Sequence, residues 1–93
     1  MIIGAMQIER YAPWVHSLKE KRMVVKSICA KAGNKFNISV AEVEKQDVHQ
    51  SIVIGIACVT DETSHADSIL DNVLNFIEEN TEAEVISVER EIL

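Results

Sequence analysis

Apolar and polar residues alternate at both ends of the chain, which is the pattern of half-buried β-strands. The alternation predicts a first strand over residues 1–10 and a last strand over Val85–Ile92. Residues 36–44 and Ser51–Thr60 are rich in β-branched residues and predict two more strands. The segment Ser51–Thr60 is almost continuously apolar, as expected for a strand at the centre of a sheet.

Two segments instead place apolar residues at helical spacing. The first predicted helix begins after Ser17, and Glu20 three residues later completes a capping box with it. Its apolar pattern ends at about Ala32, where Gly33-Asn34 is a C-terminal stop signal.

The second predicted helix follows the central strand. Thr63 or Ser64 supplies its N-cap, Asp67 suits the helix dipole near its start, and Asn80 ends it. Its apolar stripe repeats every three or four residues between these ends.

The resulting order of elements is βαββαβ, two split βαβ units that together are typical of the ferredoxin-like fold. Residues 1–93 are therefore expected to form one domain, a two-layer α+β sandwich. Right-handed crossovers predict an antiparallel sheet in the strand order 4-1-3-2, with both helices on one face.

This arrangement leaves the other face of the sheet uncovered by the chain. If the even-numbered residues of the first strand face the helices, Ile3 and Ala5 lie on the open side. The third strand adds one of two sets: Val53, Gly55, Ala57 and Val59, or Ile54 and Ile56. Either set makes the open face apolar and favours a homodimer through the sheet face or an edge strand. The alternative is a sheet that tolerates exposed apolar groups.

Charge is divided unevenly along the chain. The net charge is −6, yet residues 1–35 carry seven basic and two acidic side chains, a net +5. Residues 36–93 carry two basic and thirteen acidic side chains, a net −11. This asymmetry predicts a molecule with one basic and one acidic region.

Much of the positive charge falls on the first predicted helix. Lys19, Arg22 and Lys26 share a narrow stripe opposite the apolar arc, and Lys31 or Lys35 extends the basic region. The stripe is interpreted either as a solvated helix face or as an anion contact for the phosphates of RNA.

Lys21 is the exception on this helix, because its direction falls on the core side. Two interpretations stand open: its stem lies along apolar surface with the ammonium at the rim, or it forms an ion pair. Glu89 or Glu91 on the last strand would supply the carboxylate of that pair.

The sequence contains no motif for catalysis or for a cofactor. Its three glycines form no phosphate-binding loop, and the first and third strands carry no aromatic residue for stacking bases. Cys29 and Cys58 lie far apart, in no metal-ligand spacing. We therefore expect no catalytic residues, no cofactor, no metal site and no enzymatic activity.

The sequence leaves two alternative roles for each of four further side chains. His16, His49 and His65 suit local hydrogen bonding, with a metal or acid–base set as the alternative. Trp14 lies in a predicted loop, where it either covers one end of the core or anchors a partner.

The chain also lacks the features of a signal peptide and of a membrane span, so a cytoplasmic location is expected. Two free cysteines are consistent with that compartment.

Several of these segments together resemble a known family. They are the first strand, residues 17–22 (SLKEKR), 36–43 (FNISVAEV), 46–47 (QD), 65–67 (HAD) and 88–92 (VEREI). In this combination the chain resembles the YlxP-like family of small bacterial cytoplasmic proteins. The resemblance implies the ferredoxin-like fold, a dimer and a link to translation, because such genes often neighbour those for ribosome-binding factor A and a translation initiation factor. It implies no established reaction.

The leading hypothesis is a non-enzymatic, dimeric, cytoplasmic protein that contacts ribosomal RNA or a ribosome-associated surface through its basic helix. One alternative is a protein–protein interaction module whose basic helix meets an acidic partner. Another is a small-ligand regulatory domain of the amino-acid-sensing type, which shares this order of elements.

Overall fold

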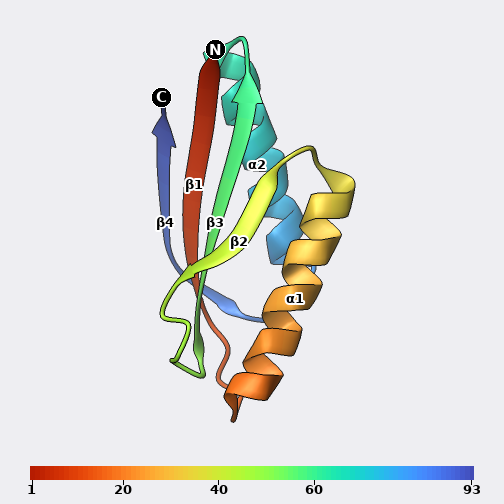
Figure 1. The fold of residues 1–93 in the computed structure, drawn as a ribbon, viewed down its shortest axis with the longest axis vertical. Coiled ribbons are helices and arrows are strands. Elements are labelled where there is room, and N and C mark those ends of the chain that lie inside the picture. Colours follow the sequence, from red (N-terminus) through yellow and green to blue (C-terminus); the bar gives the residue numbers. More distant parts are fainter.

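The computed structural model describes residues 1–93 and contains six elements. They are β1 (Ile2–Tyr11), α1 (Leu18–Lys35), β2 (Ser39–Glu44), β3 (Ser51–Thr60), α2 (Thr63–Glu79) and β4 (Glu84–Ile92). The strands form one antiparallel sheet in the order β2-β3-β1-β4, and both helices lie against the same face (Figure 1). This is the predicted ferredoxin-like sandwich, because the order 2-3-1-4 is 4-1-3-2 counted from the opposite edge.

The register of the central strands decides which residues face the helices. Met6 pairs with Ile56 and Ile8 pairs with Ile54, and all four side chains are buried in the core. The helices contribute Val25 and Ile28 from α1 and Ala66, Leu70, Val73 and Ile77 from α2. Burying each of the larger side chains contributes roughly 1.5–3 kcal/mol, which makes this cluster the main source of stability.

Gly4 lets α2 approach the sheet closely. A Cβ atom at this position would lie 3.2 Å from the Ala66 Cβ and 3.3 Å from the Leu70 Cδ1. The even-numbered face of β1 is therefore the helix face, as predicted, and Ile3 and Ala5 lie on the open side.

The end of α1 differs from the prediction. The helix continues through Gly33-Asn34 to Lys35, and Phe36 is its C-cap, with its backbone N–H donating to the Ala32 carbonyl. Gly33 does not adopt a positive φ, so it does not terminate the helix. The Phe36 ring instead packs edge-on against Phe76 of α2, with centroids 5.6 Å apart, which fixes this end of α1.

The start of α2 also differs. Glu62 is its N-cap and makes no side-chain capping bond, so neither Thr63 nor Ser64 has the predicted role. The Thr60 hydroxyl bonds the backbone N–H and carbonyl of Glu62 and thereby shapes this turn. Asn80 is the C-cap, as predicted.

Candidate nucleic-acid interface

The predicted basic stripe lies on the exposed surface of α1. Ser17 starts the helix, with its Oγ accepting a hydrogen bond from the Glu20 backbone N–H at 3.1 Å. The reciprocal bond of a capping box, from the Ser17 N–H to the Glu20 carboxylate, is not formed. Lys19, Arg22 and Lys26 are all exposed, as their spacing predicted.

All the lysine and arginine side chains that are exposed and have no acidic partner lie on α1. The exposed lysine and arginine side chains that lie beyond 4 Å from every carboxylate are Lys19, Arg22, Lys26, Lys31 and Lys35. Lys21, Lys45 and Arg90 form ion pairs, and Arg10 is buried. The free positive charge of this acidic protein is therefore concentrated on one helix.

Lys31 and Lys35 lie on a different side of α1 from the stripe. At 100° per residue, Lys31 points about 120° away from Lys19. The Lys35 ammonium lies 5.2 Å from the centroid of the Phe76 ring, so that flank faces α2. The predicted contact set therefore separates into a stripe of three residues and Lys31 on the α2 side.

Lys21 is buried and forms an ion pair, but not with the predicted residue. Its side chain is 1% exposed, and its Nζ lies 2.8 Å from Oε2 of Glu42 on β2. The pairing with Glu89 or Glu91 is wrong, since α1 packs against β2 whereas β4 packs against α2. Glu89 and Glu91 also lie on the open side of the sheet, opposite Gln7 and Ala5.

The Lys21 ammonium also holds the connection between β2 and β3. It donates hydrogen bonds to the carbonyls of Lys45, at 2.5 Å, and Val48, at 2.7 Å. Lys45 adopts a positive φ of 54° and its carbonyl also accepts from the Val48 N–H, so this connection is a tight turn. Lys21 thus fixes the basic helix to the sheet and to this turn at once.

Arg10 is a second buried cation, which the sequence analysis did not identify. It continues the core-facing series of β1 and is 3% exposed. One Nη donates to the Ala83 carbonyl, while Nε and the other Nη are buried without an acceptor. Burial lowers the pKa of the Arg10 guanidinium, and the charge of Glu78 partly opposes that shift. Arg10 thereby anchors the connection between α2 and β4.

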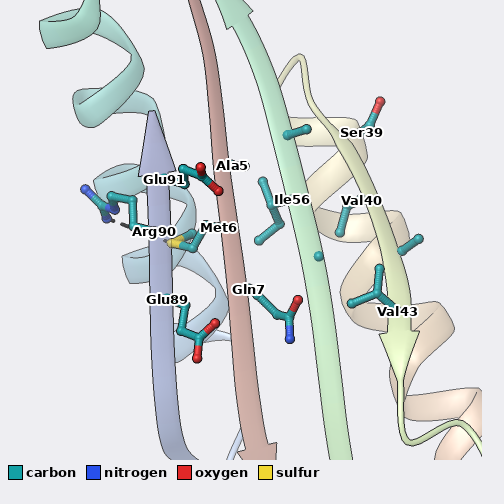
Figure 2. A pocket seen from close by; sticks show the side chains of 13 residues that line it. Ala5, Met6, Gln7, Ser39, Val40, Val43, Ile56, Glu89, Arg90 and Glu91 are labelled. Carbon is teal, nitrogen blue, oxygen red and sulfur yellow. Dashed lines mark hydrogen bonds between the residues drawn. The ribbon is translucent and has the colours of Figure 1, made fainter. Parts of the chain in front are cut away.

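The open face of the sheet is a shallow groove of about 630 Å³ (Figure 2). Small residues form its floor: Ala5 on β1, Ala41 on β2, and Gly55 and Ala57 on β3. The register confirms the first of the two predicted sets for β3, because Ile54 and Ile56 face the helices. Val59, at the end of that set, is 67% exposed.

The two margins of this groove differ in chemistry. Val43 lies over Gly55, where an added Cβ would be only 2.7 Å from the Val43 Cγ1. Glu89 and Glu91 border the opposite margin on β4, while Arg90 between them turns toward α2 (Figure 2). There it pairs with Asp71, 2.8 Å away.

The remaining candidates do not come together. His16, His49 and His65 are exposed, and no group of three or more His, Cys, Asp or Glu side chains is arranged to hold a metal ion.

Burial, and then the charge of Glu42, raise the pKa of the Cys29 thiol. No helix has the length and apolar content needed to cross a membrane.

The fold defines the class of protein, a small ferredoxin-like α+β domain. A de novo designed protein with a ferredoxin fold, LFR1 1, superimposes with a TM-score of 0.62 at 16% identity, covering 99% of this chain and 85% of that one. The de novo designed protein Foldit4 matches with a TM-score of 0.52 at 14% identity, covering 99% and 94%. At these identities the likeness concerns the fold alone.

Within that class the chain belongs to the family described as "Protein of unknown function (DUF503)", which matches residues 3–90. It is 43% identical over 83 residues to the "Uncharacterized protein YlxP" of Bacillus subtilis (strain 168), covering 89% of this chain and 90% of that protein. The predicted family resemblance is confirmed.

Proposed function

We propose that this protein is a non-enzymatic cytoplasmic factor that contacts ribosomal RNA, or a ribosome-associated surface, through the stripe of Lys19, Arg22 and Lys26 on α1. The supporting observation is that every exposed lysine or arginine side chain without a carboxylate partner lies on α1. Lys19, Arg22 and Lys26 form no ion pair within the protein that phosphate binding would have to break. The acidic remainder of the surface repels phosphate and so restricts the contact to this helix.

Three phosphate contacts predict weak binding that depends on salt. With a slope of about 0.7–0.9 per contact, affinity falls by roughly 20- to 40-fold between 50 and 200 mM salt. Co-sedimentation with ribosomal subunits over this range measures the fall.

The decisive variant neutralises the stripe with Lys19→Gln, Arg22→Gln and Lys26→Gln. A matched control, Ser64→Glu, Ser68→Glu and Asn72→Glu on exposed positions of α2, lowers the net charge by the same amount. We expect the stripe variant to lose sedimentation and the control to keep most of it. Equal behaviour of the two variants would contradict the proposal.

A second candidate is a contact between the basic helix and an acidic protein, which the same unpaired cations would favour. Nuclease treatment separates the two, because a protein contact survives digestion of the RNA. Association that persists after digestion would replace the RNA proposal with this one.

We further propose that the protein acts as a homodimer through the open face of the sheet. Exposed or half-buried apolar residues continue across that face, among them Ile3, Ala57 and Val59, and homodimer interfaces are enriched in such surface. Analytical ultracentrifugation should show a dimer that Val59→Glu dissociates. Ile86 is 56% exposed on the edge strand β4, so Ile86→Glu is the control. Dissociation by Ile86→Glu alone would place the interface at the edge.

A further inference from the structure

A second groove opens on the helix side, between α1 and the end of α2. Its apolar lining includes Trp14, Met23, Val24 and Ile28, and its far wall carries Glu79 and Glu82. Trp14 is 40% exposed and Met23 is 65% exposed. The Trp14 indole and the Met23 thioether are therefore accessible to a planar ligand that binds in the groove.

The groove shares one border with the basic stripe. Met23 follows Lys19 by four residues and precedes Lys26 by three, so it lies between them on the helix surface. Both lysines are exposed and unpaired. A phosphate bound at this border would therefore sit next to the apolar lining.

The opposite wall is acidic. Glu79 and Glu82 form no ion pair, so their carboxylates can accept hydrogen bonds from a ligand. Arg10 on β1 contacts this wall, because its guanidinium donates a hydrogen bond to the carbonyl of Ala83, the residue after Glu82. The wall is thus tied to β1.

From the stripe on α1 toward the end of α2, the surface therefore presents the cations beside the groove, then the aromatic and aliphatic lining of the groove, then carboxylates without ion pairs. A nucleotide has the complementary sequence of groups: an anionic phosphate, a flat ring, and an edge that carries N–H donors. Guanine is the base whose Watson–Crick edge places two adjacent donors, N1–H and the N2 amino group, where one carboxylate can accept both. Carboxylates also repel phosphate, so this wall excludes the RNA backbone and admits the base edge.

We infer that this groove receives one unstacked guanine of a single-stranded RNA, which stacks on Trp14 while Glu79 or Glu82 accepts from its Watson–Crick edge. The inference rests on the proposed function, because Lys19 and Lys26 hold the adjacent phosphates. The inferred base site adds a preference for guanine to the proposed contact, which otherwise involves only the RNA phosphates.

The experiment uses the intrinsic fluorescence of Trp14, the single tryptophan of the chain. The probes are end-labelled U-rich oligonucleotides with one central guanine, inosine, adenine, cytosine or uracil. Label anisotropy reports binding of any strand, and tryptophan quenching reports stacking. We expect the guanine strand to bind about 5- to 150-fold tighter than the uracil strand, the range of one bidentate contact. Inosine, which lacks the N2 amino group, should fall between them.

Two sets of variants separate stacking from edge recognition. Glu79→Gln and Glu82→Gln, alone and combined, should remove the preference for guanine while salt-dependent anisotropy persists. Trp14→Ala should weaken every strand by about 5- to 150-fold, and Trp14→Phe should restore most of the affinity. Circular dichroism confirms that each variant is folded.

Three outcomes would overturn the inference. Equal binding of all five strands without quenching, but with salt dependence, removes the base site and leaves the proposed function intact. Absence of salt-dependent anisotropy with every strand overturns the proposed function itself. Quenching by a Lys- and Leu-rich peptide but by no oligonucleotide assigns the groove to a protein partner instead.

Discussion

Replacing Lys21 with methionine is expected to destabilise the protein strongly, although the side-chain volume is nearly retained. Lys21→Met removes the ion pair with Glu42 and both hydrogen bonds to the turn carbonyls. The Glu42 side chain is only 15% exposed, so water compensates little of the charge left behind. Removing one partner of a buried ion pair costs about 3–5 kcal/mol.

That cost is large for a chain of this size, because small domains are stable by only about 5–15 kcal/mol in total. Urea unfolding followed by circular dichroism measures it directly. Lys19→Met is the matched control, since Lys19 is exposed on the same helix and unpaired, and it should change the free energy of unfolding by less than about 0.5 kcal/mol.

The double variant Lys21→Met with Glu42→Leu tests the cause of the loss. It removes the orphaned carboxylate, so it should be more stable than Lys21→Met alone, with a coupling energy of about 1–3 kcal/mol. The reasoning would be refuted if Lys21→Met cost no more than Lys19→Met, or if the double variant showed no coupling.

Three further substitutions test other contacts. Gly55→Ala forces an added Cβ against Val43 and should cost about 1–3 kcal/mol by urea unfolding; an unchanged midpoint would mean that Val43 moves freely. Ser17→Ala removes the α1 N-cap and should cost about 0.5–2 kcal/mol, whereas Ser17→Asp should retain the stability. Burial and then Glu42 raise the pKa of the Cys29 thiol, so the folded state holds this proton more tightly than the unfolded state. The free energy of unfolding should therefore fall as the pH rises from the ordinary thiol pKa through the folded one; Cys29→Ser should remove that fall, and an identical alkaline slope in both proteins would contradict this.

The sequence predicted the order of the elements because each signal was local, and it predicted their pairing because right-handed crossovers restrict the strand order. Alternation identified β1, and helical spacing identified α1 and α2. The terminators were less reliable, since Gly33 is compatible with a helix when tertiary contacts, here between Phe36 and Phe76, favour one more turn. A stop signal in the sequence indicates where a helix can end, but tertiary packing determines where it does end.

The side chain of Lys21 was predicted correctly from the sequence, but its ion-pair partner was not. The helical wheel correctly placed this lysine on the core side, but its partner depends on which strand lies beneath α1. That strand is β2, which supplies Glu42 together with the turn that follows it. The groove beside Trp14 was likewise absent from the prediction, because the connection after α2 supplies its wall.

The salt dependence of RNA binding by the stripe on α1 tests the central claim most directly. Binding of a single-stranded fragment of ribosomal RNA is titrated by anisotropy at several salt concentrations, for the unmodified protein, the Lys19, Arg22 and Lys26 glutamine variant, and the charge-matched α2 control. We predict that the stripe variant reduces the slope of log K against log salt by about 2 to 3, and that the control leaves this slope nearly unchanged. An unchanged slope in the stripe variant, or an equal reduction in both variants, would contradict the claim that these three residues bind phosphate.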